Sequence, residues 1–166
     1  MRISIFGMGY VGAVCAACLA DRGHAVIGVD IAQTKLDLIN RGESPIVEPG
    51  LGQLLRRGVD AGRIRATADT AAAVRETQLS MICVGTPSLK NGDLDLHFVQ
   101  TVIAEIGAAL RDKHERHTVV VRSTVLPGTI KNVVVPLLEG TSGKRAGRDF
   151  GFGNNPEFLR ESTAIA

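Results

Sequence analysis

The feature that most constrains this chain is the segment Gly7-Met8-Gly9-Tyr10-Val11-Gly12, which matches the pattern G-x-G-x-x-G. It follows an apolar run at 2–6 and opens a stretch of small, mostly apolar residues at 10–22. In a turn between a buried strand and a helix, Gly7 makes the tight turn, Gly9 lets a pyrophosphate approach the backbone, and Gly12 allows close helix–strand packing. The phosphates then lie at the helix N-terminus, where free N–H groups favour an anion.

An acidic residue at the end of the next expected strand indicates which dinucleotide binds. Asp30 follows the run 25–29 and lies 18 residues after Gly12. A carboxylate there accepts a hydrogen bond from the ribose 2′-OH of NAD and repels the 2′-phosphate of NADP. Ile31 and Ala32 offer no arginine to offset this repulsion. We therefore expect NAD as the cofactor, and the alternative of a glycine turn without a ligand is disfavoured by this context.

The remaining chain alternates between short apolar runs and segments with helical spacing. The pattern predicts strands at 2–6, 25–29, 64–67, 79–84, 118–121 and 150–152. It predicts helices at 10–22, 34–40, 51–59, 71–76, from a cap at Asp95 through Leu110, and at 128–138, where a valine run also permits a strand. A polar loop is expected at 139–149. This alternation predicts an α/β fold, a doubly wound, Rossmann-type, mostly parallel sheet with helices on both faces.

Composition narrows the class of protein. The 166 residues fit one domain, and 45% hydrophobic residues are enough for a core. A net charge of +2 without a basic cluster gives no nucleic-acid footprint. No apolar run approaches the ~20 residues of a membrane helix, and no A-x-A-like cleavage site follows the N-terminus. We expect a cytoplasmic protein that binds neither nucleic acid nor membrane.

The cysteines offer a competing interpretation. Cys15 and Cys18 form a C-x-x-C pair, but a redox pair needs its thiolate at a helix N-terminus, which the glycine loop already occupies. A zinc site needs a second ligand pair, and the chain's histidines show no suitable spacing. We expect no metal, and we interpret Cys15, Cys18 and Cys83 as buried packing residues.

Three polar segments follow expected strands: Gly85-Thr86-Pro87, Ser123-Thr124 and Asn155-Pro156-Glu157. Each alone is compatible with ordinary loop chemistry. Ligands of a doubly wound sheet bind beyond the carboxyl ends of its strands, at the same edge as the glycine loop. Together the three segments predict a binding cleft there.

Five blocks carry a resemblance to a known family: MRISIFGMGYVGAVCAACLADRGHAVIGVD, SPIVEPGL, ICVGTPSLKNGDLDL, VVVRSTVLPGT and NPEFLREST. They resemble the UDP-glucose/GDP-mannose dehydrogenase family over essentially the whole chain. The family implies two successive oxidations of a sugar C6 alcohol to a carboxylate with two NAD. Within this resemblance, the residues of KNGDLDL and RSTVLPGT favour GDP-mannose over UDP-glucose as the substrate. The product would then be GDP-mannuronate, an alginate precursor. A non-catalytic NAD-sensing module is the other alternative, and NPEFLRES disfavours it.

The resemblance also implies roles for particular residues. Contacts to NAD are implied for Tyr10, Val11, Asp30, Lys35, Thr86 and Thr124. Thr124 would also help to hold a catalytic water, Glu157 would act as an acid/base through that water, and Glu161 would lie near the substrate and the nicotinamide. The alternatives are a solvated helix face for Lys35 and helix N-terminal carboxylates for Glu157 and Glu161.

One departure from the family pattern limits what this chain is expected to do. The family's nucleophilic cysteine lies in a downstream G-G-x-C-x-x-K-D block, and neither it nor a downstream lysine has a counterpart here. The ending RESTAIA carries no helix stop, which suggests a chain cut inside a helix. We expect residues 1–166 to be an NAD-binding domain truncated before the family's central helix and sugar-nucleotide-binding domain. It should bind NAD without turnover, and the full-length protein should be a homo-oligomer.

Overall fold

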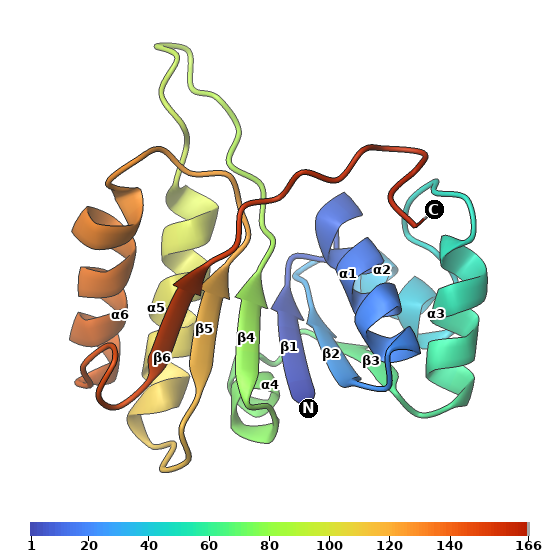
Figure 1. Cartoon of the computed structure of the whole chain (residues 1–166), viewed down its shortest axis with the longest axis horizontal. Helices are drawn as coiled ribbons and strands as arrows, with labels where there is room; N and C mark the ends of the chain where they lie inside the picture. The colour runs from blue at the N-terminus through green and yellow to red at the C-terminus, as the bar shows by residue number, and fades with distance from the viewer. Residues whose placement is uncertain (166) are drawn as a thin grey trace.

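The computed structural model describes residues 1–165 and contains a sheet of six parallel strands in the order β3-β2-β1-β4-β5-β6 (Figure 1). The strands are β1 (Arg2–Phe6), β2 (Ala25–Val29), β3 (Ile64–Thr67), β4 (Leu79–Ile82), β5 (Thr118–Val121) and β6 (Gly151–Asn154). The chain moves outward from β1 through β2 to β3, and then returns to place β4 on the other side of β1. The predicted doubly wound fold is confirmed, and the strand order reverses between β1 and β4, where such folds bind ligands.

Helices cover both faces of the sheet. One group consists of α1 (Tyr10–Asp21), α2 (Gln33–Asn40) and α3 (Leu51–Asp60). The other consists of α4 (Thr70–Glu76), α5 (His97–Arg111), the short π-helical turn η1 (Ile130–Val134) and α6 (Val135–Ser142). Within the described residues no helix has the length and apolar character needed to cross a membrane.

Alternation along β1 divides the core between the two faces. Ile3 and Ile5 pack with α1, while Phe6 packs with Ile103 and Ile106 of α5 on the opposite face. Small residues dominate the inner side of α1, where Ala13, Ala16, Ala17 and Ala20 are fully buried. Short side chains let the helix lie close to the strands, which fixes the position of its N-terminus above the sheet edge.

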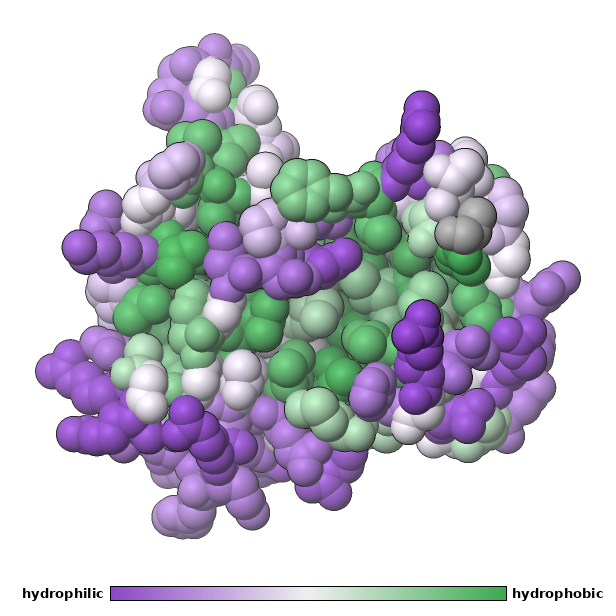
Figure 2. All heavy atoms as spheres, in the orientation of Figure 1, coloured by the Kyte–Doolittle hydropathy of each residue, from purple (hydrophilic) through white to green (hydrophobic). Residues whose placement is uncertain are grey.

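One half of one sheet face carries no helix among the described residues. In Figure 1, α1, α2 and α3 lie on the side of β1, β2 and β3, and none of them covers β4, β5 or β6. Leu79, Met81 and Val120 are only partly buried, and Figure 2 shows apolar residues over this part of the molecule.

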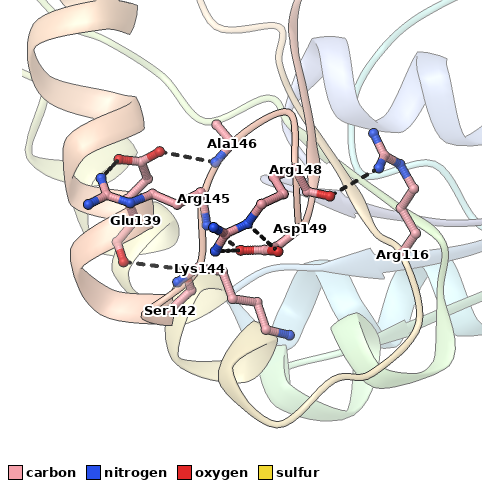
Figure 3. Close-up of polar contacts among 8 residues, drawn as sticks. All are labelled: Arg116, Glu139, Ser142, Lys144, Arg145, Ala146, Arg148 and Asp149. Carbon is pink, nitrogen blue, oxygen red and sulfur yellow. Dashed lines mark hydrogen bonds and ion pairs between the residues drawn. The ribbon is translucent and has the colours of Figure 1, made fainter.

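The segment expected to be a loop at 139–149 is more ordered than the sequence suggested (Figure 3). Helix α6 continues to Ser142 and ends at Gly143, whose φ is +70°. The carboxylate of Glu139 accepts hydrogen bonds from the amide of Ala146 at 3.0 Å and from Arg145 Nη1 at 2.9 Å, and these bonds lower the pKa of Glu139. This arrangement, the Glu139 clasp, folds the polar loop back onto the last turn of the helix and includes none of the expected site residues.

Three further expectations differ from the structure. Strand β4 ends at Ile82 rather than Val84. Asp95 does not cap α5 at the N-cap position, which Leu96 occupies, although its Oδ1 accepts a hydrogen bond from the amide of His97 at 2.9 Å. The described chain also does not end inside a helix, since residues 155–165 form no helix or strand and cross the sheet edge toward α3 (Figure 1).

Candidate functional site

The glycine loop has the geometry that a bound pyrophosphate requires. Gly7 adopts φ +90°, and its amide donates to the Val29 carbonyl at 2.8 Å. A Cβ at Gly12 would lie 1.9 Å from the carbonyl oxygen of Gly7, so this position admits only glycine. A Cβ at Gly9 would meet nothing within 4 Å. The space above Gly9 is therefore open to a ligand, while Gly12 serves the packing of α1 on β1.

The N-terminus of α1 is free to bind an anion. Gly9 is the N-cap residue and supplies no side chain to accept from the first-turn amides, to which Tyr10 and Val11 belong. Uncapped amides and the helix dipole together favour a phosphate at this position. The residues present thus fit the diphosphate of a dinucleotide.

Asp30 is held by the loop next to it. Its Oδ2 accepts from the Met8 amide at 2.7 Å and from Lys35 Nζ at 3.2 Å, and its Oδ1 accepts from the Ala32 amide at 2.9 Å. The side chain is only 8% exposed. Burial would raise the pKa of Asp30, but the hydrogen bonds from Ala32, Met8 and Lys35 outweigh burial and lower it. An ionised acceptor is therefore fixed beside the glycine loop, and the Lys35 side chain, which is 38% exposed, contacts it from the solvent side.

A cleft of about 200 Å³ opens at the carboxyl ends of β4 and β5. Its lining residues are Val11, Cys83, Val84, Gly85, Thr86, Arg122, Ser123, Thr124 and Glu157. Thr86 Oγ1 donates to the Thr124 carbonyl at 2.8 Å, and Ser123 Oγ donates to the Val84 carbonyl at 2.6 Å. These bonds join the two segments that follow β4 and β5. The structure thus brings the three polar segments together with the first turn of α1.

The two glutamates of the NPEFLRES block lie differently. Glu157 lines the cleft, and its carboxylate accepts a hydrogen bond from the Leu159 amide. Glu161 is exposed, does not line the cleft and lies near Tyr10. Because no helix begins here, neither glutamate is a helix N-terminal carboxylate.

Sequence reasoning missed Glu48, which organises the rim of the site. Its side chain is buried at 7% exposure and accepts from Tyr10 Oη at 2.5 Å. It also accepts from the amides of Ser162 at 2.8 Å and Ala164 at 3.0 Å. Burial and the bond to Glu48 raise the pKa of Tyr10 to about 12. The only sequence signal was a glutamate inside the proline-punctuated segment SPIVEPG.

Arg122 was also missed. It follows β5, lines the cleft, and donates from Nη1 to Asn155 Oδ1. Its Nε is buried without a hydrogen-bond partner. The available signal was a charged residue directly after an apolar strand rich in valine.

The cysteines do not pair as the C-x-x-C spacing suggested. The Cys15 thiol of α1 lies near Cys83, and both thiols are near Arg122. Cys18 lies near Asp21 and Arg22 instead, and burial raises its pKa. All three are partly buried and pack against the core under α1. Among the described residues, no three His, Cys, Asp or Glu side chains converge as metal ligands.

A parallel sheet in this order, with a glycine loop at α1 and a carboxylate after β2, defines a Rossmann-type dinucleotide-binding domain. The chain belongs to the UDP-glucose/GDP-mannose dehydrogenase family, whose NAD-binding domain matches residues 1–166. NAD is accordingly its cofactor, as the position of Asp30 predicted.

Several known proteins are similar to this chain. GDP-mannose 6-dehydrogenase of Pseudomonas syringae pv. syringae is 68% identical over 165 residues, covering 99% of this chain and 38% of that protein. UDP-glucose 6-dehydrogenase of Haloferax volcanii is 42% identical, with the same coverage of 99% and 38%. A ternary complex of GDP-mannose dehydrogenase from Pseudomonas aeruginosa superimposes with a TM-score of 0.98 at 68% identity, again covering 99% of this chain and 38% of that one. The chain thus spans about 38% of the length of these relatives.

Proposed function

We propose that this chain is the cofactor-binding part of an enzyme that oxidises GDP-mannose to GDP-mannuronate, an alginate precursor, with two NAD. The observation that carries the proposal is the difference in identity between two groups of relatives. Curated GDP-mannose 6-dehydrogenases reach 68%, whereas UDP-glucose 6-dehydrogenases of Haloferax volcanii and Pseudomonas aeruginosa reach 42% and 38%. UDP-glucose is the second candidate substrate, since the shared family supports it.

The residues of the site divide into those that hold the cofactor and those that face the reaction. The amides of the first turn of α1 bind the diphosphate, and Asp30 accepts from the ribose hydroxyl. The amides of Ala32 and Met8, together with Lys35 at 3.2 Å, keep that carboxylate ionised. Thr86 and Thr124, joined by their hydrogen bond, border the cleft in which the nicotinamide ring would lie. NAD supplies a hydride acceptor when bound.

We assign the role of acid and base in the cleft to Glu157. It lines the same cleft as Thr124, so the two side chains can hold one water molecule between them. A carboxylate that acts through such a water takes a proton from the sugar hydroxyl as the hydride leaves, and returns it later. Glu161, at the rim, is assigned to contact with the sugar nucleotide.

The chain alone should not complete the reaction. The oxidation of an aldehyde to an acid is easier through a covalent thiol adduct. Cys83 is the thiol that lines the cleft, but the neighbouring Cys15 and burial raise its pKa well above the usual value, which makes it a poor nucleophile at neutral pH. The nucleophile, the substrate domain and the subunit contacts of a homo-oligomer are therefore assigned to sequence outside these residues.

Two measurements test the proposal. Calorimetry should show that the purified chain binds NAD, and NADH absorbance should show no steady turnover with GDP-mannose above a Thr124→Ala control. The complete gene product should form two NADH per GDP-mannose and act poorly on UDP-glucose. Steady turnover by residues 1–166 alone would disprove the proposal that the nucleophile and the substrate domain lie outside these residues. A preference for UDP-glucose would establish the second candidate substrate.

A further inference from the structure

A second hollow, of about 130 Å³, opens at the amino ends of the strands, which is the edge of the sheet opposite to the cofactor cleft (the lower edge in Figure 1). Its lining residues are Arg2, Ala25, Val26, Ile27, Gly62, Arg63, Arg65 and Glu76. None of them lines the cofactor cleft. Three arginines against one glutamate leave an excess of positive charge, which favours an anion in this hollow.

Strand pairing explains why the arginines gather here. Arg2 of β1 pairs with Ala25 of β2, and the Val26 amide donates to the Arg63 carbonyl at 2.7 Å, which places Arg63 beside Ala25. Arg2 and Arg63 therefore lie in one row and on one face of the sheet, with a single alanine between them. Because neighbouring strands are ~4.8 Å apart, the α-carbons of the two arginines are separated by roughly 10 Å. The small alanine leaves the space between the two long side chains open.

One of the three arginines is neutralised, and two are not. Arg65 Nη2 donates to Glu76 Oε2 at 2.7 Å. Within the part of the chain that the structure describes, neither Arg2 nor Arg63 forms an ion pair. The Nε of Arg63 is buried there without a hydrogen-bond partner. A buried donor without a partner is unfavourable, so an acceptor atom of a ligand in the hollow would stabilise this arrangement.

The nearby end of α4 does not oppose an anion. The last carbonyls of a helix carry a partial negative charge, which would repel one. Lys113 Nζ donates to three carbonyls at this end, those of Val74, Arg75 and Thr77, at 3.0, 2.8 and 2.9 Å. A cation therefore already compensates the helix end, and the carboxylate of Glu76 is paired with Arg65. The positive excess remains with the two unpaired arginines.

We propose that this hollow binds a phosphoryl group, either as inorganic phosphate or as the terminal group of a phosphomonoester, with Arg2 and Arg63 as its ligands. A guanidinium presents a planar fork of donors that matches a phosphate, and it stays charged at physiological pH. The size selects a small ligand, since pockets for drug-sized molecules measure roughly 300–1,000 Å³. The site is separate from the diphosphate site at the N-terminus of α1, and it does not depend on the proposed reaction.

Calorimetry with inorganic phosphate tests the proposal. The purified protein is first saturated with NAD, so that the diphosphate site is filled, and ionic strength is held constant with sodium chloride. We expect one phosphate to bind per chain. The titration is repeated with methyl phosphate. Tighter binding of methyl phosphate would identify the ligand as a phosphomonoester, and tighter binding of inorganic phosphate would identify it as the free ion.

Four variants assign the binding to this hollow. Arg63→Met should weaken phosphate binding on the order of tenfold or more, because a charged donor is lost. Arg63→Lys should fall between this variant and the unmutated protein, since it keeps the charge without the fork. Ala25→Glu should abolish binding, because it places a carboxylate between the two arginines at an exposed position. Arg56→Met, which removes an exposed arginine of α3, is the matched control and should bind phosphate normally.

A second measurement needs no substitution and therefore decides the question even if Arg63→Met does not fold. In the unmutated protein with NAD, phosphate should slow the modification of Arg63 by phenylglyoxal, followed by peptide mass spectrometry, and should leave Arg56 unaffected. Equal modification of Arg63 with and without phosphate would contradict the proposal. So would phosphate that binds only in the absence of NAD, or an equal loss of affinity in Arg63→Met and Arg56→Met. NAD binding, measured separately, is unaffected by any of these outcomes.

Discussion

The hydroxyl of Tyr10 donates a 2.5 Å hydrogen bond to Glu48, and this bond joins the first turn of α1 to the loop before α3. The same carboxylate accepts from the amides of Ser162 and Ala164. Glu48 thereby connects the start of α1, the loop before α3 and the C-terminal segment, and Ala164 lies 116 positions from Glu48 in the chain. The segment that carries Glu157 is positioned over the cleft partly through this connection.

Removal of the Glu48 carboxylate should release the C-terminal segment. In Glu48→Gln, the amide cannot serve as the same ionic acceptor for Tyr10 and for two backbone amides, because one of its two oxygens is replaced by a donor. We expect trypsin to cut after Arg160 severalfold faster than in the unmutated chain. Tyr10→Phe removes the hydroxyl's bonds to Glu48 and to the Arg160 carbonyl but leaves the amides of Ser162 and Ala164 paired with the carboxylate, so cleavage should rise less than in Glu48→Gln. Equal cleavage rates in all three proteins would show that Glu48 does not hold this segment.

Asp30→Ala should weaken NAD and reduce the discrimination against NADP. The variant loses an ionised acceptor for the ribose hydroxyl, and hydrogen bonds to charged groups contribute about 1.5–3 kcal/mol, which is tenfold or more in affinity. It also leaves the Met8 amide without its partner, so thermal unfolding must be measured alongside calorimetry. Lys35→Met is the control, because it removes only the cation and leaves both the ribose acceptor and the partner of the Met8 amide in place, so NAD affinity should fall less than in Asp30→Ala. If the unmutated chain bound NAD and NADP equally, Asp30 would have no role in selection.

The free energy of unfolding should decrease as the pH is lowered, because the chain buries a neutral histidine. His117 is 1% exposed, and its ring bonds to Thr77 O at 3.1 Å and Ser80 Oγ at 2.8 Å. Burial and the charge of Lys113 lower its pKa from 6.5 to about 4. Between these values the unfolded chain binds more protons than the folded chain, so the free energy of unfolding decreases as pH falls from 6.5 toward 4. At about 1.4 kcal/mol per pKa unit, the full loss is about 3 kcal/mol.

Urea denaturation at pH 7 and pH 5.5 tests this, above the range in which the carboxylates titrate. His117→Gln should show a smaller decrease in unfolding free energy between the two pH values, whatever its stability at pH 7. The exposed His114 provides a control, and His114→Gln should keep the full decrease. A decrease that is the same in both variants would assign the pH dependence to other groups.

The fold was predictable from the sequence because local and global signals agree along this chain. The run 2–6 and the run 118–121 are apolar, short and followed by turn residues, and they became β1 and β5 with the predicted bounds. The glycine spacing and Asp30 also predicted which edge of the sheet binds the cofactor, because this motif specifies a strand, a tight turn and a helix in a fixed arrangement. Element ends were less accurate. Helix α6 continues past Leu138, where Glu139 accepts hydrogen bonds from Arg145 and from the Ala146 amide. Hydrophobic periodicity gives no indication of these polar contacts.

The contacts that complete the site could not be predicted in this way. Glu48 and Ser162 are 114 residues apart, and nothing in either segment specifies the other. The approach of Cys83 to Cys15 likewise depends on the pairing of β4 with β1, whereas the visible C-x-x-C spacing pointed to Cys18. Contacts of this kind depend on how distant segments are placed by the fold. A residue pattern indicates only which side chains are neighbours within one helix or strand.

Two glycines of the same motif should respond oppositely to alanine. A methyl at Gly12 would lie 1.9 Å from the Gly7 carbonyl oxygen, so α1 must move away from β1. Overpacking of this kind costs about 1–3 kcal/mol or more, and Gly12→Ala should lower the melting temperature or fail to fold. A methyl at Gly9 meets nothing within 4 Å, so Gly9→Ala should fold with nearly unchanged stability. That methyl projects into the space above the uncapped helix, where the diphosphate must approach, so NAD affinity should fall on the order of tenfold or more. Thermal unfolding and calorimetry on the two variants check both halves of the prediction. A Gly9→Ala variant that binds NAD normally would mean that the diphosphate does not lie on the N-terminus of α1.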